Sequence, residues 1–164
     1  MSKQVAKAIR TNLKSLGLTS KKVSVRSKSY AGGSSVHVTV KDLSVDLPTV
    51  KRIASAEAVV RRCAYSGEIL GGGTFVFVES DHGIEETLAA VIKADWASGS
   101  PVALGAYVLV NMRNGDLGVA EAREEGAGEI FTSVDDFYSD PEQILALRAA
   151  RNAIHTGLLT GGAA

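Results

Sequence analysis

Residues 23–41 contain the clearest hydrophobic pattern in the chain, because valine occupies alternate positions in two short stretches. These stretches flank a centre of Ser-Tyr-Ala-Gly-Gly-Ser at positions 29–34. Alternation sends successive side chains to opposite faces of a strand, and a glycine centre favours a tight turn. The sequence therefore predicts a β-hairpin with a valine core face. The opposite face carries polar and basic side chains: Ser24, Arg26, Lys28, His37, Thr39 and Lys41.

Helical patterns lie on both sides of this hairpin. Residues 3–16 repeat apolar positions at helical spacing, and Gly17 is a plausible stop. A second helix is predicted to begin at Asp46-Leu47-Pro48 and to run to about residue 62, with proline in its first turn. The residues expected to be buried are Val5, Ile9, Leu13 and Leu16 in the first helix and Val50, Ile53 and Val60 in the second.

The middle of the chain predicts one strand and one helix. Residues 74–78 are Thr-Phe-Val-Phe-Val, a run without polar alternation that is typical of a strand covered on both faces. Asp81 is placed to cap a helix over residues 84–96. Its inward side is expected to hold Ile84, Leu88, Val91 and Ile92.

The last third predicts a hairpin and a terminal helix. Asn114-Gly115 separates two apolar segments, residues 106–112 and 117–122, which is a strong hairpin signal. Residues 123–129 are acidic and contain glycine, so we expect a loop there. Ser139-Asp140-Pro141-Glu142 predicts the start of a helix that runs to about residue 155.

Together these elements predict an α+β fold with a mainly antiparallel sheet. The order is an N-terminal α-β-β-α-β unit, then a helix, an Asn-Gly hairpin and a C-terminal helix. Ser98-Gly99-Ser100-Pro101 is the best boundary candidate. It divides the chain into a basic part, residues 1–98, and an acidic hairpin-plus-helix part, residues 99–164, with a single domain as the alternative.

The zero net charge of the 164 residues conceals a division along the chain. Up to Arg62 there are thirteen Lys or Arg and three Asp or Glu, a formal charge of +10. The remainder has five basic and fifteen acidic residues, a formal charge of −10. This asymmetry predicts a basic face for a polyanion, or else halves that pack together or pair with a second copy.

Bulk features give an expected location. No apolar run approaches the roughly 18 residues of a membrane helix, and no apolar signal core begins the chain. The single cysteine, Cys63, excludes an internal disulfide and is consistent with a reducing compartment. We therefore expect a cytoplasmic protein that does not associate with membranes.

The helix and hairpin also resemble a known module, the large polyvalent protein associated domain of type 29, in roughly the first third of the chain. The motifs that carry this resemblance are Ser-Val-Arg-Ser at residues 24–27 and Gly-Gly-Ser-Ser at residues 32–35. Two features depart from the family pattern: Gly17-Leu18 follows the first helix, and Asp42-Leu43-Ser44 precedes the second. Further matching residues are Arg10, Leu13, Val23, Lys28, Tyr30, Val36, Val38 and Asp42.

The resemblance implies an origin rather than a chemistry. Such modules occur in multidomain proteins of bacteriophages and conjugative elements, and their own activity is undefined. A stand-alone copy is expected to be a DNA-associated accessory protein or an inhibitor of a host defence system, acting in the host cytoplasm.

Several residue groups are candidates for a site. The preferred binding surface is Arg26, Lys28, Tyr30, His37 and Lys41, since basic and aromatic side chains hold phosphates and stack bases. The alternative is a solvated sheet surface, or one covered by the acidic half. The glycine runs at 32–33 and 71–73 suit tight turns better than phosphate loops, because neither is followed by Gly-Lys-Ser/Thr.

No catalytic or metal-binding constellation stands out. His82 follows Asp81, and Cys63 follows Arg61-Arg62, which would lower the pKa of its thiol. Neither has a partner at a spacing typical of catalysis, and metal-ligand spacings are lacking. Acidic residues crowd into residues 121–142 and are either a solvated face or a mimic of nucleic-acid phosphates.

The sequence thus predicts a non-enzymatic protein that acts by binding, with no cofactor. The first hypothesis is a phage or mobile-element protein that inhibits a host defence complex of the CRISPR or restriction type. The alternative is a nucleic-acid-binding module that uses the basic hairpin face. An enzyme of unknown class is the third, and self-association stays open.

Overall fold

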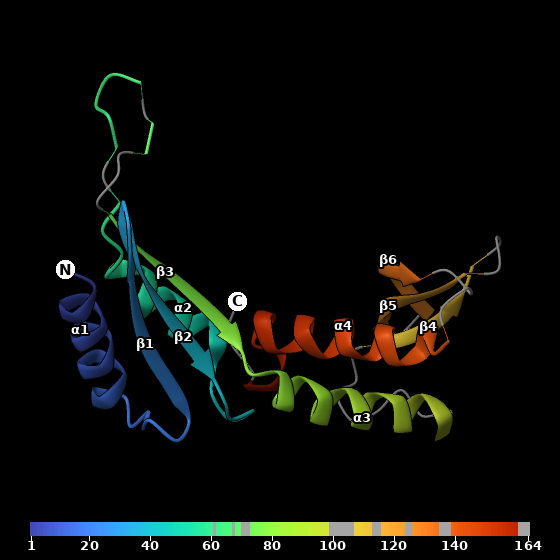
Figure 1. Cartoon of the computed structure of the whole chain (residues 1–164). Coiled ribbons are helices and arrows are strands. Elements are labelled where there is room, and N and C mark those ends of the chain that lie inside the picture. Colours follow the sequence, from blue (N-terminus) through green and yellow to red (C-terminus); the bar gives the residue numbers. More distant parts are fainter. Residues whose placement is uncertain are drawn as a thin grey trace. The chain divides into compact units, whose positions relative to one another are not determined.

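The computed structural model describes residues 1–60, 62–66, 68–69, 73–98, 107–112, 116–123, 126–134 and 139–160. The chain forms two compact units, Met1–Asp81 and His82–Gly161 (Figure 1). We call them the N-terminal unit and the C-terminal unit. The division lies before the helix at residues 82–98, whereas the sequence suggested a boundary after that helix.

The N-terminal unit has the predicted α-β-β-α-β order. Its three strands pair in the order β1-β2-β3, antiparallel between β1 and β2 and parallel between β2 and β3. The parallel pair requires a crossover, which α2 supplies. The elements are α1 (Ser2–Ser15), β1 (Val23–Tyr30), β2 (Gly33–Val40), α2 (Leu47–Ala56) and β3 (Thr74–Ser80).

Local signals explain where these elements begin and end. β1 and β2 are joined by Ala31-Gly32, and Gly32 has a φ of 88°, which a residue with a Cβ adopts only with strain. The carboxylate of Asp46 accepts a hydrogen bond from the amide of Thr49 at 2.9 Å and so caps α2. Both the hairpin and the start of α2 are confirmed.

One face of the sheet is the core of this unit. The side chains of Val36, Val38 and Val40 are fully buried. α1 contacts β1, β2 and α2, and α2 contacts β3, so the two helices lie together over the valine face. Ile9 and Leu13 on α1 and Val50 on α2 fill the space between. The strand alternation then leaves the opposite face without a covering helix from the described residues of this unit.

Three burial predictions for this unit are wrong. Leu16 lies just beyond the end of α1 and is 54% exposed. β3 is an edge strand and is not covered on both faces, since Phe77 is 50% exposed. α2 ends at Ala56, so Val60 lies beyond the helix and is 40% exposed. In each case the apolar residue type suggested burial. Beside Val60, Val59 pairs with Thr74 only through an isolated bridge at the margin of the sheet.

The C-terminal unit combines two helices with a second sheet of three strands in the order β4-β5-β6. Both pairings are antiparallel, and Asn111 lies opposite Leu117 across the predicted hairpin, whose Asn-Gly turn falls outside the described residues. β6 corrects the loop expected at residues 123–129. The elements are α3 (His82–Ser98), β4 (Tyr107–Asn111), β5 (Leu117–Arg123), β6 (Gly126–Val134), α4 (Pro141–Thr156) and the short helix η1 (Leu158–Thr160).

α3 and α4 pack against each other through small residues, and the described ion pairs between them are Glu85 with Arg151 and Lys93 with the α4 cap residue Asp140. Ala89 on α3 and Ala146 and Ala153 on α4 are fully buried, whereas Val91, predicted to face inward, is 42% exposed. In α3 the buried positions include Glu85, whose carboxylate accepts hydrogen bonds from the Arg151 guanidinium at 2.8–3.2 Å.

The register of β2 can be tested with a pair of adjacent substitutions. Val38→Thr places a hydroxyl in the core and should lower the opening free energy of the hairpin by about 1–3 kcal/mol. Thr39→Val changes the opposite face and should alter it by less than about 0.5 kcal/mol. Hydrogen exchange of peptides covering β1 and β2 measures both. Equal effects would show that the two faces are not distinguished as described.

The Glu85–Arg151 pair predicts an asymmetric response. The Glu85 side chain is 5% exposed and that of Arg151 is 60% exposed. Arg151→Met removes the guanidinium from a buried carboxylate and should destabilise the unit by about 2 kcal/mol, more than Glu85→Met, which leaves a cation that water can solvate. The fluorescence of Trp96, the single tryptophan, follows unfolding of this unit. The reverse order would contradict this account.

Candidate functional site

The predicted binding residues lie together on the uncovered face of the N-terminal sheet. The antiparallel register places Arg26 opposite His37, and the parallel register places His37 opposite Phe77. Directly paired residues in a sheet direct their side chains to the same face. One row across the sheet therefore contains a guanidinium, an imidazole and a phenyl ring.

A second row lies next to the first. Lys28 pairs with Ser35, which pairs with Phe75. Beyond it, Tyr30 pairs with Gly33 at the end of the hairpin. A Cβ on Gly33 would lie 3.2 Å from the Tyr30 ring, so glycine allows that ring to lie across the neighbouring strand.

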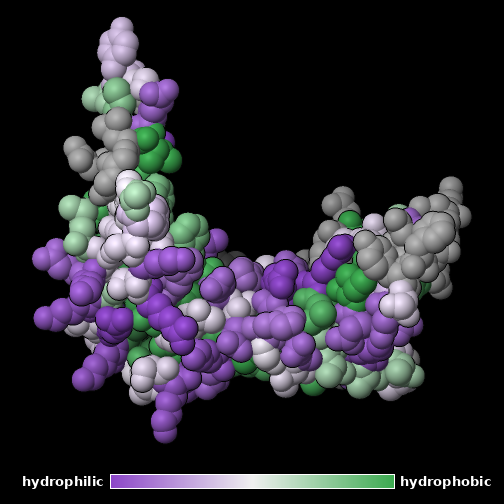
Figure 2. Space-filling model, in the orientation of Figure 1, coloured by the Kyte–Doolittle hydropathy of each residue, from purple (hydrophilic) through white to green (hydrophobic). Residues whose placement is uncertain are grey.

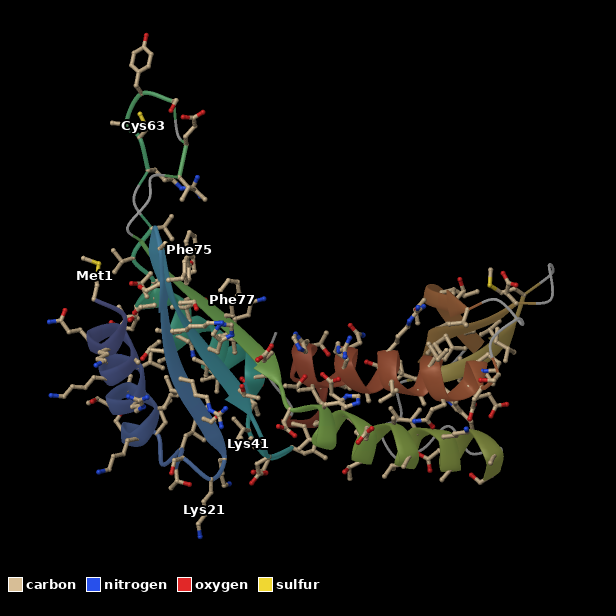
Figure 3. The ribbon with its side chains drawn as sticks, in the orientation of Figure 1. Met1, Lys21, Lys41, Cys63, Phe75 and Phe77 are labelled. Atoms are coloured by element: carbon tan, nitrogen blue, oxygen red, sulfur yellow. The ribbon has the colours of Figure 1, made fainter. Side chains whose placement is uncertain are left out.

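Aromatic contact links β2 to β3. The rings of His37 and Phe77 are stacked, with centroids 5.1 Å apart and planes inclined by 25°. Phe75 and Phe77 follow each other along β3 (Figure 3). Phe77 is 50% exposed and Tyr30 is 48% exposed, so both present ring surface to solvent.

We call this surface the open sheet face and define it by its basic, aromatic and imidazole side chains. A groove of about 510 Å³ lies over the part of this face that carries the basic side chains, and Arg26, Lys28, His37 and Lys41 are among the residues that line it. The face consists of Arg26, Lys28, Tyr30, His37, Lys41, Phe75 and Phe77.

The charges on the open sheet face are unevenly distributed. Among the described residues, no carboxylate forms an ion pair with Arg26, Lys28 or Lys41. Glu79 and Asp81 also line the groove, and Glu79 pairs with Thr39, one row beyond His37. The end of the groove near Asp81 therefore carries two carboxylates together with Lys41, whereas the part toward the hairpin turn carries only the basic Arg26 and Lys28.

Other basic residues of this unit are already engaged or point elsewhere. The Arg10 guanidinium donates a hydrogen bond to the carbonyl of Val25 at 2.6 Å. Lys22 forms an ion pair with Asp42 at 3.7 Å. Residues 1–81 carry thirteen basic and six acidic residues, a formal charge of +7, and hydrophilic side chains dominate the view of this unit's body in Figure 2.

The phenylalanines of β3 were missed by sequence reasoning. Their apolar neighbours suggested a strand buried on both sides, but Phe75 and Phe77 alternate with Val76 and Val78. Glu79 continues the alternation on the side of the phenylalanines. That one exposed carboxylate is the signal that could have assigned them to a solvent-facing side.

The glycine-rich stretches do not offer a phosphate loop among the described residues. Gly33, Ser34 and Ser35 belong to β2, and both serines are buried. The Ser34 hydroxyl lies 2.8 Å from that of Thr74, and the Ser35 hydroxyl lies 3.2 Å from Nε2 of His37. The first contact links β2 to β3 and the second lies within β2, while Gly71 and Gly72 lie outside the described residues.

The candidate catalytic residues, His82 and Cys63, belong to segments of the chain outside the three strands that form the open sheet face. His82 is mostly exposed and pairs with Glu86 at 3.2 Å within α3. In the described part of the chain, no group of three His, Cys, Asp or Glu side chains is arranged to hold a metal ion. Of the acidic candidates, Glu124, Glu125, Asp135 and Asp136 lie outside the described residues.

Cys63 directly follows Arg62, which forms an isolated β-bridge with Ile69. The pKa of its thiol is lowered from 9.0 to about 7, chiefly by a hydrogen bond from the Ser66 side chain, then by the amides of Ser66 and Tyr65. The sequence had attributed such a shift to the preceding arginines, so the cause differs from the expected one.

No family model, curated protein or solved structure matches this chain. The resemblance of the first third to the type 29 polyvalent protein domain therefore stays a prediction. The helices of the described residues include none that is long and apolar enough to cross a membrane.

The Cys63 turn gives a pH-dependent prediction. Alkylation by iodoacetamide requires the thiolate, so its rate should rise with pH through a midpoint near 7. Ser66→Ala removes the largest cause and should move that midpoint upward toward the ordinary thiol value, whereas Ser55→Ala on α2 should not. Because Cys63 is the only cysteine, total labelling reports this site alone. An unchanged midpoint in Ser66→Ala would refute the assigned cause.

Proposed function

We propose that this protein binds nucleic acid through the open sheet face of its N-terminal unit. The observation that carries the proposal is the row formed by Arg26, His37 and Phe77, in which a cation lies beside a stacked ring pair whose Phe77 ring is 50% exposed. A charged backbone and planar bases are the two features of a nucleic acid that such a row can contact together.

Electrostatics support the same partner. The N-terminal unit has a formal charge of +7, and Arg26 and Lys28 are exposed on adjacent rows of one strand. Exposed cations attract phosphates over about 8 Å at physiological ionic strength. The acidic C-terminal unit, with a formal charge of −7 over residues 82–164, is not a candidate for the same contact.

The phage or mobile-element origin and the inhibition of a host defence complex stay proposals that rest on the resemblance. The open sheet face favours nucleic acid over a protein partner, because its half-exposed rings lie beside cations rather than in an apolar patch. A defence inhibitor that uses this face would contact a complex through its bound nucleic acid.

Charge reversal tests the proposal. Arg26→Glu combined with Lys28→Glu should weaken binding to a labelled oligonucleotide by at least ~10-fold at low salt, because two phosphate contacts are replaced by repulsion. The matched control is Lys3→Glu with Lys7→Glu, an equal charge change on exposed positions of α1. Fluorescence anisotropy measured over a salt series gives both affinity and its salt dependence.

A smaller salt slope in the first variant than in the unmodified protein is expected, since fewer counterions are released. Equal losses in the two variants would indicate only a response to net charge and would reject this face. A pull-down from lysate, with and without nuclease, examines the competing hypothesis. A partner that is still recovered after nuclease treatment, but is not recovered by the Arg26→Glu plus Lys28→Glu variant, would show that this face binds a protein instead of nucleic acid.

A further inference from the structure

We infer that the open sheet face takes a single strand rather than a duplex, with its backbone along β1 and its bases turned toward β3. This inference rests on the proposed function and specifies its substrate class. Arg26 and Lys28 lie on β1, and Lys41 directly follows β2, whereas both phenylalanines lie on β3. Around Arg26 and Phe77 the cations and the phenyl rings therefore lie on opposite sides of the sheet, and Tyr30 adds an aromatic ring at the turn end of β1.

The division matches the geometry of one nucleotide chain. Adjacent strands lie about 4.8 Å apart, so Arg26 on β1 and Phe77 on β3 are separated by about 10 Å of sheet. A phosphate held at Arg26 places its own base or a neighbouring one over the centre of the sheet. There the stacked pair of His37 and Phe77 offers aromatic surface, since Phe77 is 50% exposed.

A duplex does not suit this face. Bases in a duplex are stacked on one another, so a phenyl ring can reach their flat surfaces only after they are unstacked. A two-stranded ribbon can enter a major groove, but β3 pairs with β2 along its length and widens the β1–β2 hairpin to a three-stranded sheet. If the β1–β2 hairpin entered a major groove, the exposed ring of Phe77 on β3 would contact no base face.

Two carboxylates at one end of the groove influence where the bound nucleotide chain lies. Glu79 continues the phenylalanine side of β3, and Asp81 lies directly after that strand. Both would repel a phosphate, and the single cation of Lys41 beside them offsets only part of their charge, so the nucleotide chain is expected to occupy the half of the face toward the hairpin turn. There Tyr30 provides a further exposed ring beyond Lys28.

Ring removal with retention of apolar bulk is the direct test. Phe77→Leu should weaken binding to a labelled oligothymidylate of about 12 nucleotides by ~5- to 100-fold, as expected for loss of one stacked base. Binding to a duplex of the same length should be unchanged. Because Phe77 is half exposed, leucine leaves the valine core intact.

Two further variants make the result specific. Tyr65→Leu removes a fully exposed aromatic ring outside the open sheet face and should have no effect. Phe77→Trp keeps a ring at the position and should retain binding, with quenching of its fluorescence by the oligothymidylate beyond any change in the unmodified protein. That quenching reports contact between base and ring independently of affinity.

The outcomes separate this inference from the proposed function. Preference for the single strand, lost in Phe77→Leu and kept in Tyr65→Leu and Phe77→Trp, supports both. Equal binding of both probes that depends on Arg26 and Lys28 but not on Phe77 overturns the single-strand inference and leaves nucleic-acid binding intact. Failure to bind either probe at low salt overturns both.

Discussion

Burial of the valine face of β2 is the constraint on which the N-terminal unit depends. Val36, Val38 and Val40 are fully buried under α1 and α2, and β2 pairs with a strand on each side. Side chains alternate along a strand, so burying this face commits Ser35, His37 and Thr39 to the other one. The register with β1 and β3 then decides which residues join them. The open sheet face is thus a direct consequence of how the core is packed.

Interactions across the sheet give that face its order. Ser34 and Thr74 share a buried hydrogen bond on the core side, which links β2 to the start of β3. On the opposite side His37 stacks on Phe77. These contacts hold the phenylalanines of β3 in a fixed register with the cations of β1, although Arg26 and Phe77 are about fifty positions apart in the sequence. A binding surface for a flexible polymer benefits from such a rigid arrangement, because the protein loses little conformational entropy on binding.

The C-terminal unit is built on a different principle. Small side chains allow α3 and α4 to approach closely, and a buried carboxylate is neutralised by a guanidinium from the facing helix. A buried charge is tolerated only with such a partner, which gives the two helices a specific alignment. The sheet of the C-terminal unit includes β6, which is formed by a glycine-containing segment whose composition favoured a loop. Pairing with β5 overrode the weak strand propensity of that segment.

Local pattern determined much of this protein. Period-two valines, the Ala31-Gly32 turn and the Asp46 cap specify the hairpin and α2, since each depends on neighbours in the chain. Alternation alone also predicts that Arg26, Lys28, Tyr30, His37 and Lys41 share one face. The position of β3 was decided only by tertiary structure. An apolar run is compatible with a central or an edge strand. β2 is the one named strand that pairs with β3 among the described residues, so β3 is an edge strand and Phe77 is exposed. For the same reason the sequence could not show that an aromatic ring completes the face, because burial depends on which elements pack nearby rather than on the residue itself.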